Sequence, residues 1–292
     1  PKSKNLIIDK TIIIPKNYTV QISPGEQILF KNNSFIFSYS PWYVNGKEKK
    51  IIIRGLKNDF GGGLLILDTN KPSVFENVEI SYLSGLNNEL KNYVDPFTEK
   101  EESTFQNSFS NSNQILYGAI NFYNAEVLLK DINFKNICSE DVVNIISSNF
   151  QIKNSSFENN CSDAIDIDFG NGKLINLEFK NIGNDAIDFS GSNAELKNIN
   201  LENIGDKLIS AGENSNIKID NLVGKNANIG IASKDGSLSI LQNIKIANLK
   251  IGLASYIKKN EYGPGKIVAE NTIINDAWKN GLTDDNSKII LN

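Results

Sequence analysis

The chain has 292 residues, which is long enough to bury a full core as one large β domain or as two average domains. Hydrophobic residues make up 40% of it and charged residues 22%, so its composition is not that of a disordered protein. The formal net charge is −4, whereas nucleic-acid binding leaves a concentrated basic face. We therefore expect no nucleic-acid partner.

The start of the chain and its hydropathy give two further expectations. The sequence opens at Pro1 without an initiator methionine, which predicts a mature or excised segment from which any signal peptide would already be gone. No uninterrupted apolar run approaches the ~20 residues of a membrane span. We therefore expect no membrane span.

The first strands are predicted within residues 10–30, KTIIIPKNYTVQISPGEQILF. Branched residues alternate there with polar ones, which is the period of a strand. Turns are predicted at Pro15, Asn17, Pro24 and Gly25. The outer edge of these strands must be covered, because an open strand edge recruits other chains.

Residues 87–114 interrupt the alternating pattern and predict a long surface loop, rich in Ser, Asn, Glu and Lys. Two interpretations of its aromatic residues stay open. They pin the loop to the protein wall, or they form one wall of a sugar-binding groove, since aromatic faces suit sugar rings. The segment SPWYVNG offers a second candidate platform. The candidate ligand-binding residues are Trp42, Tyr43, Tyr93, Phe97, Phe105 and Phe109.

A repeat with a period of 22 residues begins at about residue 127. When the repeats are aligned, two apolar columns and two Asn columns emerge. The columns are Ile165, Ile187, Ile209, Ile231 and Leu253; Phe157, Phe179, Leu201 and Val223; Asn154, Asn176, Asn198 and Asp220; and Asn159, Asn181 and Asn203, with Asn136 one residue out of step. At Lys218 the register slips, which predicts a local bulge or slipped strand.

The segments between the Asn positions, such as AIDID and AIDFS, are short and alternating, so they predict strands rather than helices. Short strands, a fixed period and Asn at turn positions predict an all-β, single-stranded right-handed parallel β-helix with about 22 residues per coil. Asn tolerates left-handed backbone geometry, and its amide can bond to the Asn of the next coil. We expect residues 1–292 to form one domain with the insertion at 87–114.

Two parts of the chain resemble known proteins. IIIPKNYTVQISPGEQILF resembles the first coils of bacterial surface β-helix proteins. NIGNDAIDFSGSNAELKNINLENIGDKLISAGENS and IGIASKDGS resemble the pectate-lyase-like β-helix region attached to bacterial CotH-kinase-like proteins. The resemblance runs from about residue 6 to the end and is specific for the fold. It implies an exported or cell-surface protein.

Pectate-lyase-like folds carry polysaccharide lyases and glycoside hydrolases, although the fold alone transfers neither activity. An arginine-based lyase has only Arg54 as its base, far in sequence from the Asp-rich coils, and a lysine-based lyase stays open. Polygalacturonase-type hydrolases use an Asp cluster with a nearby His, and this chain has no His. A paired-carboxylate hydrolase requires two Asp side chains in one cleft, one with a raised pKa.

Successive repeats place acidic residues at matching points, in SDAIDID and NDAIDFS. Asp166 is expected ~4.8 Å from Asp188 on the next coil, and Asp163 beside Asp185 with Glu140 beneath. Such like charges are destabilising, so water, Lys207 or a cation must relieve them; carboxylates suit Ca²⁺ as a cofactor. Two interpretations stay open: solvated wall residues, or a cation or substrate site. The candidate metal ligands are Asp163, Asp166, Asp168, Asp185 and Asp188.

Cys138 and Cys161 lie 23 residues apart at nearly matching positions of neighbouring coils. Their column continues as Gly183, Gly205 and Ala227, which indicates a tight place that accepts only small side chains. The two cysteines are either a stacked pair of buried thiols or, in an exported protein, a disulfide. Neither has a His partner for catalysis or metal binding.

These features predict a non-catalytic extracellular or cell-surface module with a structural or glycan-binding role and a polysaccharide as its partner. The alternative is a polysaccharide lyase or glycoside hydrolase acting on an acidic glycan. A catalytic groove gathers Asp, Lys and aromatic side chains on one lateral face, whereas a structural module scatters them.

Overall fold

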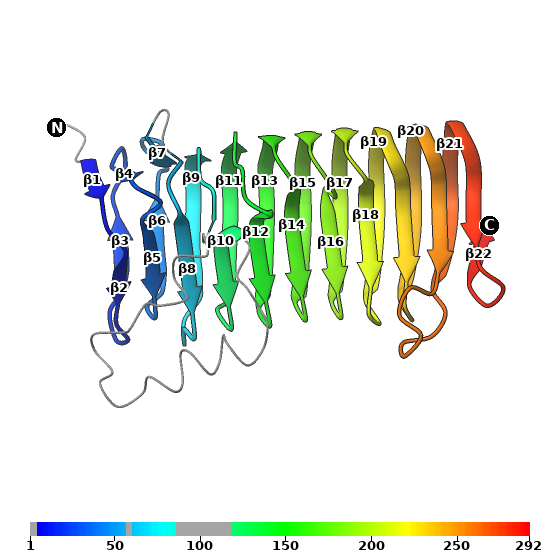
Figure 1. Cartoon of the computed structure of the whole chain (residues 1–292), viewed down its shortest axis with the longest axis horizontal. Helices are drawn as coiled ribbons and strands as arrows, with labels where there is room; N and C mark the ends of the chain where they lie inside the picture. Colours follow the sequence, from blue (N-terminus) through cyan, green and yellow to red (C-terminus); the bar gives the residue numbers. More distant parts are fainter. Residues whose placement is uncertain (1–4, 57–59, 86–117) are drawn as a thin grey trace.

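The computed structural model describes residues 5–56, 60–85 and 118–292. Its coils stack side by side along one long axis, with the two termini at opposite ends (Figure 1). All pairings between named strands in the described part are parallel, and they join 22 strands into one continuous sheet. The prediction of a parallel β-helix is confirmed. The predicted loop at 87–114 lies outside the described residues.

The strands are β1 Asn5–Ile8, β2 Ile12–Ile14, β3 Val20–Ile22, β4 Gln27–Phe30, β5 Phe35–Ser38, β6 Trp42–Asn45, β7 Ile51–Gly55, β8 Gly63–Leu67, β9 Ser73–Ser81, β10 Gly118–Tyr123, β11 Val127–Lys135, β12 Asp141–Ile146, β13 Asn149–Asn160, β14 Asp163–Asp168, β15 Asn171–Ile182, β16 Ile187–Ser190, β17 Asn193–Ile204, β18 Lys207–Gly212, β19 Asn216–Lys234, β20 Leu238–Tyr256, β21 Lys266–Thr283 and β22 Lys288–Leu291. No helix in the described part of the chain has the length and apolar character that a membrane crossing requires.

Each regular coil has three straight segments. In one coil these are residues 163–168, 171–175 and 177–180, separated by left-handed residues at Phe169 (φ 53°) and Asn176 (φ 55°). Asn adopts this geometry at low cost, so its recurrence sets the corners. The first two segments carry the surfaces considered below.

The interior is one continuous apolar core that extends from Ile8 to Ala269. The predicted Ile column is confirmed, because its members are direct partners on successive coils and are fully or almost fully buried: Ile165, Ile187, Ile209, Ile231 and Leu253. A second column stacks the rings of Phe134, Phe157 and Phe179, with centroids 4.5 and 4.9 Å apart. Alternation along each strand therefore separates core from wall.

The register beyond residue 212 differs from the fixed 22-residue period. Asn193 pairs with Asn216, one residue beyond that period, and Glu213 and Asn214 at the intervening turn are both left-handed. Lys218 consequently pairs with Glu195 on the wall. Val223 pairs with Asn200 rather than Leu201 and is 47% exposed, so the prediction that it continues a core column is wrong.

Asn side chains form two hydrogen-bonded ladders along the solenoid. The same added residue moves the first ladder from the predicted Asp220 to Asn221, whose Nδ2 donates to Asn198 Oδ1 at 2.8 Å. Asp220 instead pairs with Lys197. The ladders are Asn154, Asn176, Asn198 and Asn221, and Asn159, Asn181, Asn203, Asn226 and Asn248.

Cys138 and Cys161 form a disulfide with a Cα–Cα distance of 4.8 Å. Both residues are exposed, so the interpretation as buried free thiols is wrong. The small-residue column beside them is tight, because a Cβ on Gly183 would lie 1.9 Å from the Cys161 carbonyl oxygen. The turn therefore brings the two backbones close enough for the bond.

Truncation of the Ile column tests the coil stacking. Ile187 and Ile209 are paired and fully buried, so replacing either with Ala should lower the free energy of unfolding by ~2–5 kcal/mol. Chemical denaturation followed by circular dichroism measures the loss. Ile240→Ala, at a 38% exposed position, is the control. A loss below about 0.5 kcal/mol at either core site, the range of surface substitutions, would contradict the register.

Removal of the disulfide tests its contribution to stability. The bond closes a loop across 23 residues of sequence separation, so a Cys138→Ser/Cys161→Ser variant should lose about 3 kcal/mol on the loop-entropy model. The melting temperature of the wild type should fall to that of the variant after reduction. A reductant effect of the same size on the variant would show that the bond is not responsible.

Candidate functional site

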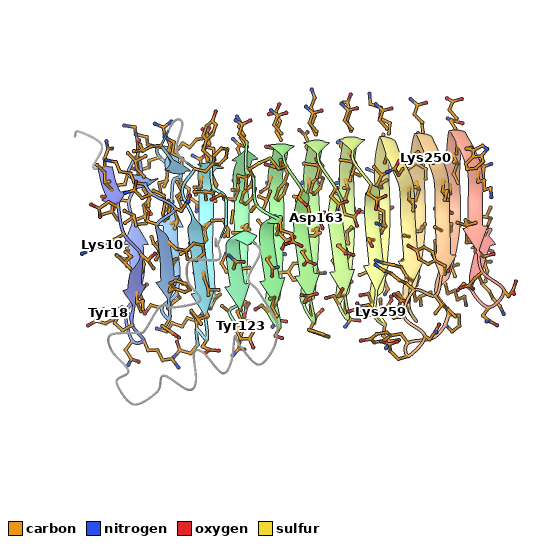
Figure 2. All side chains as sticks on the ribbon, in the orientation of Figure 1. Lys10, Tyr18, Tyr123, Asp163, Lys250 and Lys259 are labelled. Carbon is orange, nitrogen blue, oxygen red and sulfur yellow. A yellow bond between two sulfur atoms is a disulfide. The ribbon has the colours of Figure 1, made fainter. Side chains whose placement is uncertain are left out.

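Polar side chains gather on the wall formed by β12, β14, β16 and β18, within the first straight segment of each coil (Figure 2, with Asp163 labelled). We call this surface the acidic face. It consists of Asp141, Asn144, Asp163, Asp166, Asp168, Asp185, Asp188, Lys207 and Ser210. The same face thus carries all five Asp residues predicted as metal ligands.

Register places the central side chains in one row across four coils: Asn144 pairs with Asp166, Asp166 with Asp188, and Asp188 with Ser210. The predicted stacking of Asp166 and Asp188 is confirmed. Asp141, rather than the predicted Glu140, pairs with Asp163, because the coil closed by the disulfide has 23 residues.

Backbone amides and one lysine relieve part of the repulsion at the face. The Asp185 N–H donates to Asp163 Oδ1 at 2.8 Å, and the Lys207 N–H donates to Asp185 Oδ1 at 2.9 Å. Lys207 Nζ lies 3.2 Å from Asp185 Oδ2 and also bonds to the Asp206 carboxylate. Of the three sources of relief left open by the sequence, Lys207 therefore acts at Asp185.

Burial raises the pKa of several carboxyl groups on the acidic face. It raises the pKa of Asp141 to about 7, that of Asp185 to about 7 and that of Asp168 to about 6. Burial also raises the pKa of Asp166 well above its ordinary value, with the charges of Asp141, Asp168 and Asp188 adding to the effect. The face therefore holds carboxyl groups that retain protons at higher pH than ordinary carboxyl groups do.

Two buried polar atoms at the ends of the central row have no hydrogen-bond partner in the described structure. Asn144 is 4% exposed, and its Nδ2 donates to Asp141 Oδ2 at 2.9 Å while its Oδ1 has no partner. Ser210 is fully buried, and its Oγ has none. An unsatisfied buried polar atom costs about 1–3 kcal/mol, so these atoms favour a ligand that supplies a hydrogen bond.

Among the described residues, no three His, Cys, Asp or Glu side chains form a group that could hold a metal ion. Backbone amides and Lys207 already occupy the oxygens of Asp163 and Asp185. The Ca²⁺ site stays a prediction.

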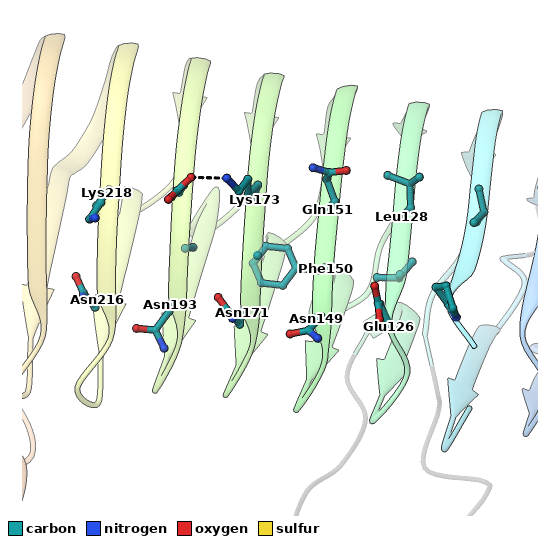
Figure 3. Close-up of a pocket in the computed structure, with 16 residues that line it drawn as sticks. Glu126, Leu128, Asn149, Phe150, Gln151, Asn171, Lys173, Asn193, Asn216 and Lys218 are labelled. Carbon is teal, nitrogen blue, oxygen red and sulfur yellow. Dashed lines mark ion pairs between the residues drawn. The ribbon is translucent and has the colours of Figure 1, made fainter. Parts of the chain in front are cut away.

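A groove of about 710 Å³ crosses the adjoining wall, on the second straight segment of the coils (Figure 3). We call it the wall groove. Residues from β11, β13, β15, β17 and β19, with two near the start of β9, line it: Pro72, Val74, Glu126, Val127, Leu128, Asn149, Phe150, Gln151, Asn171, Gly172, Lys173, Asn193, Ala194, Glu195, Asn216 and Lys218. The sequence prediction missed this surface. Its signal was Asn at 149, 171 and 193, one period apart.

The two predicted aromatic ligand-binding residues that the structure describes differ in exposure. Trp42 is 2% exposed and stacks on Phe75 in the core with ring centroids 6.3 Å apart, so its proposed role as a sugar platform is wrong. Tyr43, the next residue, is 44% exposed on the wall. The other four aromatic candidates lie outside the described residues: Tyr93, Phe97, Phe105 and Phe109.

Comparison with known families finds a match to the model described as the right handed beta helix region, over residues 141–292. Comparison with curated proteins finds no match.

Three solved structures illustrate the likeness. An alginate lyase from Paenibacillus sp. str. FPU-7 is 11% identical with a TM-score of 0.41, covering 92% of this chain and 99% of its own. A periplasmic alginate epimerase, AlgG, is 11% identical with a TM-score of 0.46, and the match covers 99% of this chain and 76% of the epimerase. The Dettilon tailspike protein is 11% identical with a TM-score of 0.43. The match covers 98% of this chain and 61% of the tailspike protein, so this chain spans less than two thirds of that protein. These values describe a likeness of fold alone.

The raised pKa values predict a pH dependence of stability. Asp141, Asp168 and Asp185 titrate near pH 6–7 when folded, whereas an unfolded Asp titrates near ~4. Between these values the folded state holds protons that the unfolded chain has lost, so stability falls as pH rises from about 4 to about 7. Three carboxyl groups have lowered pKa values and so affect stability only at pH values below this window: Glu76, Glu195 and Asp284. The pKa of Lys207 is raised, so this group affects stability only above the window.

Thermal melts at pH 5 and pH 8 check this expectation. The wild type should melt at a lower temperature at pH 8, and Asp141→Asn should narrow the difference, because it removes one carboxyl group that holds a proton in the fold. Asp285→Asn, at an exposed position, should leave the difference unchanged. A wild-type melting temperature that is equal or higher at pH 8 would contradict the burial of these groups.

Proposed function

Because this chain belongs to the family of right-handed β-helix regions, whose parallel coils form long lateral walls, we propose that it is a polysaccharide-binding module that uses its acidic face. The observation that carries the proposal is the row from Asn144 to Ser210. Two unpartnered buried polar atoms there flank stacked Asp166 and Asp188. Sugar hydroxyl groups both donate and accept, so they suit both carboxylates and the orphan oxygens.

An uncharged glycan suits the acidic face better than an acidic one. The face carries one cation, Lys207, and that cation already pairs with Asp185 and Asp206. Carboxylate groups on a ligand would meet the repulsion that the face carries within itself. We therefore propose a neutral polysaccharide as the partner.

An extracellular or cell-surface location fits this function. The Cys138–Cys161 disulfide supports it, because such bonds form and persist in oxidising compartments. The bond is exposed, so a reducing cytosol would have access to it.

Glycoside hydrolysis is the second candidate, and the pKa values of the acidic face favour it. A carboxyl group with a pKa of about 6, such as Asp168, retains a share of its protons near neutral pH and can donate one to a leaving group. An ionised neighbour is the second group that hydrolysis requires. Asp residues and Lys207 gather on this one face, which is part of the distribution expected of a catalytic groove; the aromatic side chains of that expectation are not among the residues of the face.

A binding and product-release assay separates the two candidates. Immobilised neutral polysaccharides should retain the wild type more strongly than the Asp166→Asn/Asp188→Asn variant, while polygalacturonate should retain neither. Glu202→Gln on β17, which bonds to Lys225 away from the face, is the matched control.

Reducing ends measured from pH 5 to pH 8 on each retained glycan test hydrolysis. Binding without product release supports the binding module, and release that the double variant abolishes supports the hydrolase. Retention of the variant equal to that of the wild type, or preference for polygalacturonate, would overturn the proposal.

A further inference from the structure

The Asn side chains of the wall groove differ from those of the two Asn ladders in their hydrogen bonding. Asn149, Asn171, Asn193 and Asn216 are direct partners on four successive coils. In the two other Asn ladders each amide bonds to its neighbour, with distances between 2.7 and 3.1 Å. In the groove these four exposed side chains make no hydrogen bond among the described residues. Their donors and acceptors are therefore available to a ligand.

A second row of side chains forms the opposite rim of the groove (Figure 3). Leu128, Gln151, Lys173, Glu195 and Lys218 follow one another in register across the coils. Lys173 Nζ lies 2.7 Å from Glu195 Oε2, so these two charges neutralise each other. The two rows run across the strands, along the long axis of the solenoid.

Small residues lie between the two rows and line the floor of the groove. Gly172 and Ala194 are partners there, next to the ring of Phe150. A Cβ on Gly172 would lie 2.1 Å from the Phe150 carbonyl oxygen and 2.7 Å from its ring. The close packing of these coils therefore excludes larger side chains at Gly172.

We propose that the wall groove binds a linear, uncharged polysaccharide that lies along the solenoid axis. The amides recur at the coil spacing of ~4.8 Å, close to the advance of a polysaccharide by one sugar ring, so successive rings meet equivalent donors and acceptors. The ionisable lining residues are two acids, Glu126 and Glu195, and two lysines, Lys173 and Lys218, which gives no net charge for an ionic polymer.

A polypeptide does not fit the groove. An extended peptide adds to a sheet through unpaired backbone groups at an edge. The groove lies on the face of β13, β15 and β17, and each of these strands pairs with a neighbour on both sides. Only side chains are available for recognition, and they repeat at the spacing of coils rather than of peptide residues.

This inference goes beyond the acidic face, because the two surfaces share no residue and lie on different segments of the coil. Asn171→Ala/Asn193→Ala removes two of the free amides. Neither residue has a left-handed backbone, so the change introduces no strain. Asn200→Ala is the matched control, since Asn200 is exposed on the same strand as Asn193 but outside the groove.

Calorimetric titration with gluco- and manno-oligosaccharides of increasing length tests the proposal, with polygalacturonate and an unstructured peptide as the other ligands. Affinity should rise with oligosaccharide length until the chain spans the groove, and it should be insensitive to salt. The Asn171→Ala/Asn193→Ala variant should bind about tenfold or more weakly than the wild type, with an unchanged melting temperature. Asn200→Ala should bind as the wild type does, and the loss caused by Asn171→Ala/Asn193→Ala should persist in an Asp166→Asn/Asp188→Asn background.

Three results would overturn the wall-groove proposal: no binding of either neutral series, preference for the polyanion or the peptide, or equal affinity in the double Asn variant. Complete loss of oligosaccharide binding in Asp166→Asn/Asp188→Asn, in which the groove is intact, would assign the ligand to the acidic face alone and contradict the groove. If Asp166→Asn/Asp188→Asn binds polysaccharide as the wild type does while Asn171→Ala/Asn193→Ala binds it weakly, only the function proposed above is contradicted.

Discussion

Parallel backbone pairing between successive coils is the constraint on which the rest of the structure depends. It holds equivalent residues of neighbouring coils at about one strand spacing, so any residue repeated at the coil period becomes a row along the axis. Rows of Ile make the core, and rows of Asn make the corners. The same pairing makes rows of like charge unavoidable wherever Asp repeats, as at Asp166 and Asp188.

The cost of that charge row is concentrated on one wall. Buried carboxyl groups respond by retaining protons, as the raised pKa of Asp141 shows, and Lys207 pairs with Asp185 beside the row. Repulsion between the carboxylates and the missing hydrogen bonds of Asn144 Oδ1 and Ser210 Oγ both lower the stability of the fold. Stability alone therefore does not explain this surface. The adjoining wall has paired charges and free amides, so the two surfaces offer different chemistry to a ligand.

The sequence predicted the architecture well because the period itself is visible in it. Ile165 to Leu253 and Asp166 with Asp188 lie where the 22-residue period places them. The errors came from coils that have one more residue. Such a coil replaces Asp220 with Asn221 in the ladder and puts Val223 on the surface, and no local pattern marks the added turn residue before Ser215.

Site details were less accessible to the sequence, because they depend on which wall a side chain faces and on what surrounds it. The sequence predicts Trp42 as a sugar-binding residue, yet alternation along β6 places Trp42 in the core and Tyr43 on the surface. The wall groove is lined by two rows of longer side chains with Gly172 and Ala194 between them, and the rows come from several coils together. The predicted Asp cluster, in contrast, follows directly from the period.

A double-mutant cycle of Asp166 and Asp188 tests the central claim, that coil pairing forces these carboxylates together. The free energy of unfolding at pH 8 is measured for the wild type, Asp166→Asn, Asp188→Asn and the double variant. Stacked carboxylates predict that each substitution relieves the same repulsion, so the effects are non-additive by about 0.5–3 kcal/mol. Additivity within about 0.5 kcal/mol, as for distant sites, would contradict the register and the acidic face built on it.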